Sequence, residues 1–65
     1  MDINEALELK IGDLVFYPED RGYRPGHSKI TFIGSTVQKN FFGKEYIWVT
    51  LQSGGVWPSN RLSKT

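Results

Sequence analysis

The sequence predicts a small all-β domain, and three observations lead to this prediction. Residues 46 to 52 alternate strictly: Ile47, Val49 and Leu51 point to one side, while rings and polar groups point to the other. This period of two is that of a strand with one buried face. Several short apolar runs are separated by Gly, Pro and Asn, which favour turns. We expect the 65 residues to form one domain, because a chain of this length builds a single core.

The first half of the chain begins with a helical turn and continues with a strand and a long loop. Residues 2 to 8 favour a helix, because Asp2 and Glu5 have the spacing of a capping box. Residues 14 to 17 form an apolar run that ends at a proline, as a strand does. The polar residues 18 to 28 predict a loop of unusual length for so small a domain, and such loops often carry function.

The second half reads as strands joined by tight turns. Residues 29 to 38 favour a strand whose phase shifts near Gly34, which predicts a β-bulge there. A hairpin connection is expected at residues 39 to 45, before the clear strand at 46 to 52. The remaining expected elements are a turn at residues 53 to 55, a short strand at 56 and 57, one helical turn at 58 to 62, and a tail at 63 to 65.

Four stretches of the chain carry a resemblance to a known family: Ile11-Gly12-Asp13-Leu14-Val15, Gly26-His27-Ser28-Lys29-Ile30 followed by Ile33, Trp48-Val49-Thr50-Leu51, and Gly55-Val56-Trp57-Pro58-Ser59-Asn60-Arg61-Leu62. In this order they resemble the Src-homology-3-like barrel superfamily, and within it the KOW and Tudor type of module, over residues 9 to 62. The resemblance implies a five-stranded barrel, with residues 1 to 8 as a helical or extended lead-in and a one-turn helix before the last strand. It also implies a module that binds RNA, DNA, proline-rich peptides, methylated side chains or proteins, so it selects no single function.

Neither a metal site nor a catalytic site is expected. The chain has no cysteine and one histidine, which are too few ligands for a zinc site. His27 and Ser28 are neighbours, as are Glu19 and Asp20, and adjacent residues seldom form a nucleophile–base pair or a split acid–base pair. The type II dihydrofolate reductase shares the barrel architecture, but its Val-Gln-Ile-Tyr stretch has no match at residues 56 to 58. We therefore expect a non-enzymatic protein without a cofactor.

The distribution of charge and of apolar residues favours a cytoplasmic protein with a mildly basic body. No apolar run approaches the roughly 20 residues of a membrane span, and residues 1 to 10 lack the pattern of a signal peptide. We therefore expect no membrane partner. The net charge is +1, but three of the seven acidic residues lie in the first nine positions, which hold no Lys or Arg. The other four acids stand against eight basic residues, so residues 10 to 65 carry +4, which permits contact with phosphates.

Aromatic residues and lysines in the middle of the chain favour a nucleic-acid surface. Phe41 and Phe42 stand between two lysines, and at least one ring must be exposed because neighbours in a strand point opposite ways. An exposed ring can stack on bases while the ammonium groups meet phosphates. We expect a nucleic-acid-binding accessory or regulatory protein of the phage or mobile-element type. Its predicted contact residues are Arg21, Arg24, Lys39, Phe42, Lys44, Tyr46 and Trp48.

Other interpretations use the same rings. In one, an aromatic groove takes an extended or proline-rich segment of a protein partner. That groove would consist of Tyr17, Tyr23, Trp48 and Trp57. In another, the exposed rings are buried between identical subunits of a homodimer or larger assembly. A small barrel can also fill both strand faces with rings simply to complete its core. The sequence leaves these alternatives open.

Overall fold

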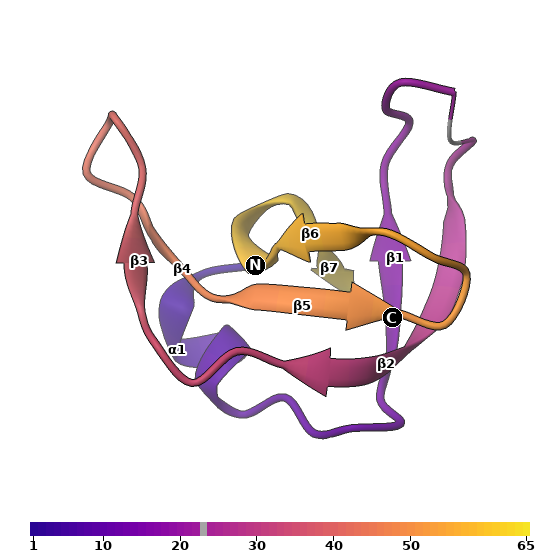
Figure 1. The fold of residues 1–65 in the computed structure, drawn as a ribbon, viewed down its shortest axis with the longest axis horizontal. Coiled ribbons are helices and arrows are strands. Elements are labelled where there is room, and N and C mark those ends of the chain that lie inside the picture. Colours follow the sequence, from indigo (N-terminus) through magenta and orange to yellow (C-terminus); the bar gives the residue numbers. More distant parts are fainter. Residues whose placement is uncertain (23) are drawn as a thin grey trace.

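The protein folds into an antiparallel five-stranded sheet, a two-stranded hairpin, one short α-helix and one 3₁₀ turn (Figure 1). A computed structural model describes residues 1–22 and 24–65. The helix is α1 (Ile3–Leu7), and the 3₁₀ turn is η1 (Ser59–Arg61). The strands are β1 (Leu14–Tyr17), β2 (Gly26–Ile33), β3 (Gln38–Lys39), β4 (Glu45–Tyr46), β5 (Trp48–Leu51), β6 (Val56–Pro58) and β7 (Ser63–Lys64). The prediction of a small, mostly β domain is confirmed.

The strand order in the larger sheet is β6-β5-β2-β1-β7, and β3 pairs only with β4. The long strand β2 serves both halves of this sheet, because β1 pairs along its first half and β5 along its second half. Among the described residues, β6 and β7 are the two edges of the sheet, and no pairing joins them. Figure 1 shows the β3–β4 hairpin projecting from one side of the sheet and the β1–β2 connection projecting from the other.

The bulge predicted in the second strand exists, but it lies earlier than predicted. The register of β2 against β5 shifts between Ile30 and Phe32, not at Gly34. Gly34 instead continues the pairing, because its N–H donates to the Trp48 carbonyl oxygen at 2.7 Å. A Cβ at this position would lie 3.2 Å from that same oxygen. The glycine therefore allows a close approach of two backbones rather than a bend.

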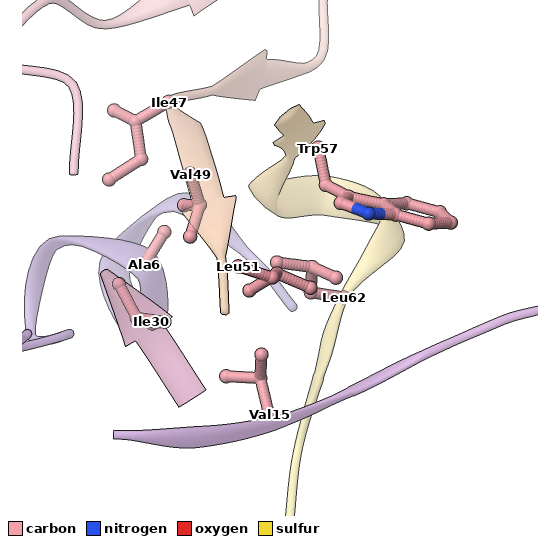
Figure 2. Packing of buried hydrophobic residues seen from close by; sticks show 8 residues of the cluster. All are labelled: Ala6, Val15, Ile30, Ile47, Val49, Leu51, Trp57 and Leu62. Carbon is pink, nitrogen blue, oxygen red and sulfur yellow. The ribbon is translucent and has the colours of Figure 1, made fainter. Parts of the chain in front are cut away.

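The core lies between the two halves of the sheet and is closed by the helix and the 3₁₀ turn. Figure 2 shows its side chains converging from α1, β1, β2, β5 and β6, and from Ile47 and Leu62, which lie between elements. They are Ala6, Val15, Ile30, Ile47, Val49, Leu51, Trp57 and Leu62. The predicted alternation is confirmed, because Ile47, Val49 and Leu51 are all buried.

Three boundaries differ from the sequence prediction. The second strand begins at Gly26, which pairs with Tyr17, so the loop spans residues 18 to 25 and is shorter than predicted. The expected tail contains β7, in which Ser63 pairs with Phe16 and Lys64 with Val15. The expected strand at 46 to 52 is interrupted at Ile47, between β4 and β5. The first and third limits follow from pairing between neighbouring strands, and the strand in the tail follows from pairing with the distant β1.

The chain's first residues are tied to its last ones. The predicted capping box of α1 is present: Asp2 Oδ1 accepts from the Glu5 N–H at 2.8 Å, and Glu5 Oε1 accepts from the Asp2 N–H at 3.4 Å. The Met1 amine donates to the Leu62 carbonyl oxygen at 2.6 Å. With Ala6 buried, these contacts hold the helix against the core.

Candidate functional site

Two aromatic rings stand side by side on the outer surface where β4 gives way to β5. Ile47 points into the core, so its neighbours Tyr46 and Trp48 point outward. Their ring centroids are 5.2 Å apart and the ring planes meet at 86°, an edge-to-face contact. Trp48 is 43% exposed. The pair therefore presents a stiff aromatic wall to solvent.

The opposite wall is formed by the end of β6 and by η1. The register of β5 against β6 places Pro58 directly across from Trp48. Together these residues line a hollow of about 210 Å³, which we call the aromatic hollow. Its lining consists of Asn40, Tyr46, Trp48, Pro58, Asn60 and Arg61.

A buried serine holds the two walls together. Ser59 is 0% exposed, and its Oγ accepts from the Ile47 N–H at 3.0 Å. Its own N–H donates to the Ile47 carbonyl oxygen at 2.9 Å. Because Ile47 lies between the two rings and Ser59 lies between Pro58 and Asn60, these two bonds fix the width of the hollow.

The rim of the hollow carries polar groups of both charges. Asn60 Oδ1 is buried and accepts no hydrogen bond from the described residues. Arg61 Nη1 lies 3.1 Å from Asp20 Oδ2, which ties the 3₁₀ turn to the β1–β2 connection. The Arg61 guanidinium also lies 6.0 Å from the centre of the Trp57 ring. Beside its aromatic and proline walls, the hollow therefore carries a base that is paired with Asp20, and a buried acceptor.

Both phenylalanines at the end of the β3–β4 hairpin are exposed. Phe41 is 96% and Phe42 is 83% exposed, and their centroids are 5.6 Å apart. Asn40 Oδ1 accepts from the backbone N–H groups of Phe42 and Lys44, both at 2.9 Å. Gly43 completes the turn with a φ of 77°, which favours glycine. We call residues 41 and 42 the hairpin tip. The prediction that at least one ring is exposed is confirmed.

The predicted basic contact residues do not gather around the aromatic hollow. Lys39 pairs with Glu45, while Gln38 pairs with Tyr46. Because paired residues share a face and neighbours alternate, Lys39 lies beside a carboxylate on the face of the hairpin opposite Tyr46. Arg21, Arg24 and Lys44 are exposed. The first two lie in the β1–β2 connection, and Lys44 lies beside the hairpin tip.

Among the described residues, the predicted aromatic groove divides into the Tyr17–Trp57 pair and the outward-facing Trp48. Trp57 is 5% exposed and belongs to the core, where its ring lies 5.7 Å from that of the half-buried Tyr17. Burial follows from its register, because Trp57 pairs with the inward-facing Val49. Trp48 lines the aromatic hollow. Tyr23 lies outside the described residues.

Sequence reasoning did not select Pro58, Asn60 or Asn40 for the site. The position of Pro58 could have been predicted, because counting outward from the turn at residues 53 to 55 places it opposite Trp48. Asn60 and Asn40 gave no such signal, since their places depend on how the 3₁₀ turn and the hairpin pack.

Other features of the described structure also bear on ligand binding. A larger hollow of about 540 Å³ lies between the start of the chain and the hairpin, where Asp2, Lys44 and Glu45 bring both charges to its lining. His27 packs edge-to-face on Phe16, with centroids 5.3 Å apart. No cluster of three metal-ligating side chains occurs in residues 1–22 and 24–65. Over the same residues, no helix has the length and apolarity to cross a bilayer.

No protein-family model, curated protein or solved structure matches this chain. The aromatic hollow and the hairpin tip must therefore be interpreted from their own chemistry.

Proposed function

We propose that this protein is a non-enzymatic module of the Src-homology-3-like barrel type that binds an extended, apolar or proline-rich segment of a protein in the aromatic hollow. The observation that carries the proposal is the edge-to-face pair of Tyr46 and Trp48 standing across from Pro58. Aromatic-lined grooves take up polyproline-type segments because these segments are already extended and lose little entropy on binding.

The order of elements supports the barrel assignment. One long strand is shared by the two halves of the sheet, and a 3₁₀ turn connects β6 to β7. Only residues 59 to 62 separate one edge strand of the sheet from the other. Small barrels bring their outer strands near each other by such short connections, although no pairing joins β6 to β7 among the described residues.

The polar rim supports a peptide as ligand. An extended peptide has backbone N–H groups without intramolecular partners, and the acceptor Asn60 Oδ1 has no donor among the described residues. Rotation of the buried Asn60 side chain toward the hollow would offer this acceptor to a ligand N–H and recover the free energy that an unpaired buried acceptor costs. The Asp20–Arg61 pair balances the charge at the rim, which favours a ligand with little net charge.

A selection experiment tests this function. A displayed library of random peptides is selected on the wild-type protein, and the enriched peptides are titrated against three proteins by Trp fluorescence and calorimetry. The wild type should bind them, and Trp48→Ala should bind at least about tenfold more weakly, since a buried aromatic anchor contributes more than 1 kcal/mol. The control Phe32→Ala removes a ring that is 61% exposed and lies outside the hollow lining, and it should bind like the wild type. Failure to enrich any peptide, or equal binding to Trp48→Ala, would refute the proposal.

Nucleic acid is the second candidate, and the hairpin tip favours it. Two exposed rings stand near Lys39 and Lys44, an arrangement suited to stacking beside phosphates. Titration of single- and double-stranded DNA and RNA at two salt concentrations tests this candidate. Binding by the tip should weaken as salt is added. The logarithm of the binding constant should fall against the logarithm of the salt concentration with a slope of about −0.7 to −0.9 per phosphate contacted. Binding should also be lost in Phe41→Ser/Phe42→Ser, and an absence of binding at low salt would eliminate this candidate.

A further inference from the structure

We propose that the aromatic hollow binds the hairpin tip of a second copy of the chain, and that two copies exchange tips to form a two-fold symmetric dimer. The inference rests on the proposed function, because it gives an occupant to the same hollow. Its starting point is that the chain carries both an apolar projection and an apolar recess.

The tip is a preformed projection. The two rings are 96% and 83% exposed, so neither enters the hollow of its own chain. Four hydrogen bonds shape the turn beneath them: Asn40 Oδ1 accepts two, at 2.9 Å each, the Asn40 carbonyl oxygen accepts one from the Gly43 N–H at 3.0 Å, and the Asn40 N–H donates one to the Lys44 carbonyl oxygen at 2.9 Å. A turn that is ordered before binding loses little conformational entropy in a complex.

The position of the tip suits a reciprocal exchange. Asn40 lines the hollow and immediately precedes Phe41, so the projection and the recess share a border. Two copies that face each other about an axis near Asn40 place each tip over the hollow of the other copy. A two-fold contact of this kind closes on itself, whereas a one-way contact would continue into a filament.

The area involved is that of a weak, transient interface. An aromatic side chain buries about 150–250 Å², so full cover of one tip at its observed exposure would bury roughly 300–400 Å². The hollow has a volume of about 210 Å³ and cannot enclose both rings. Two tips and two recesses therefore bury less than about 1,200 Å² in total, which is typical of weak, transient association.

The charges near the contact are compatible with association. Lys44 lies beside the tip, and Asp20 lies 3.1 Å from Arg61, which lines the hollow. Opposite charges at a rim guide docking more than they add affinity. Dimer formation is therefore expected to depend mainly on the rings.

Sedimentation equilibrium over a range of protein concentrations tests the inference. The wild type should pass from monomer to dimer as its concentration rises. Phe41→Ser/Phe42→Ser and Trp48→Ala should each remain monomeric. The control Leu7→Ser/Ile11→Ser removes two apolar side chains that are 61% and 69% exposed, away from tip and hollow, and it should dimerise like the wild type. Circular dichroism checks that every variant is folded.

Mixing the two monomeric variants distinguishes an exchange of tips from a stacking of tips. The tip variant retains an intact hollow, and Trp48→Ala retains an intact tip, so the mixture should form heterodimers that are weaker than the wild-type dimer. If tips stacked on each other, Trp48→Ala alone would still dimerise. A wild-type protein that stays monomeric, a dimerising Trp48→Ala, an open series of oligomers or a mixture without heterodimers would each overturn the inference.

Peptide binding by the tip variant separates this inference from the proposed function. If Phe41→Ser/Phe42→Ser binds the selected peptides while the wild type never dimerises, the function stands and the inference fails. If the exchange dimer forms but no peptide binds, the peptide-binding function fails and the inference stands. If both hold, peptide should dissociate the wild-type dimer, because the two ligands compete for one hollow.

Discussion

Replacing Ser59 by alanine should destabilise the protein far more than the loss of one hydroxyl suggests. Ser59 Oγ accepts from the buried Ile47 N–H at 3.0 Å, and no water can take its place because the serine is 0% exposed. Leaving a buried donor without a partner costs about 1–3 kcal/mol. A domain of 65 residues is stable by only about 3–10 kcal/mol. The substitution therefore removes a large part of the total stability.

The loss can be expressed as a melting temperature. At about 2.1 cal/mol/K per residue, the unfolding entropy of 65 residues is about 0.14 kcal/mol/K, so Tm should fall by about 7–20 °C. Circular dichroism measures this shift, and amide hydrogen exchange should show faster exchange at Ile47. The control Ser35→Ala changes an exposed serine and should shift Tm by less than about 4 °C. A similarly small shift for Ser59→Ala, with the Ile47 amide still protected, would refute the reasoning.

Three further substitutions probe other contacts. Asp2→Ala removes the capping box with Glu5 and should lower the free energy of unfolding, measured in urea, by about 1 kcal/mol. An unchanged free energy of unfolding would mean that α1 is held only by its contacts with the core. Gly43→Ala introduces a side chain at a φ of 77° and should lower the free energy of unfolding by about 1 kcal/mol or more. Unchanged stability would show that the turn adopts another conformation without cost. Asp20→Asn breaks a partly exposed ion pair with Arg61 and should change stability by less than about 1 kcal/mol, so that a larger loss would contradict this estimate.

The parts of the fold that were predictable are those determined by near neighbours in the chain. The burial of Ile47, Val49 and Leu51 follows from a period of two that can be counted directly. The capping box of α1 depends on two residues three positions apart. The strand Leu14–Tyr17 has the limits that its apolar run indicates. In each case the relevant interaction lies within a few residues.

The parts that were not predictable depend on register between distant strands. The expected tail contains a strand because Ser63 meets Phe16, and nothing near Ser63 in the sequence indicates this. Trp57 is buried because it pairs with Val49. A one-residue change of register would have reversed that orientation. The register of the β5–β6 hairpin therefore decided that Trp57 is buried while Trp48 lies at the surface.

The same limit applies to the candidate site. The outward position of Tyr46 and Trp48 was readable from their alternation with Ile47. In the second wall, only the position of Pro58 follows from the hairpin register, while Asn60 reaches the hollow through the packing of η1. The charge of +4 on residues 10 to 65 does not locate a basic surface, since Lys39 is opposed across the hairpin by Glu45. A sum of charges carries no information about their positions.

The pairing of Phe16 with Ser63 has a consequence for how the protein is made. Strand β1 is flanked by β2 on one side and by β7 on the other, so its last neighbour emerges from the ribosome some 46 residues after it does. Contacts between such distant segments form slowly, because a long loop must close before they contribute. We expect the nascent chain to remain unfolded until translation has passed β7. Limited proteolysis of ribosome-bound chains of increasing length would show at which length the chain becomes resistant to the protease.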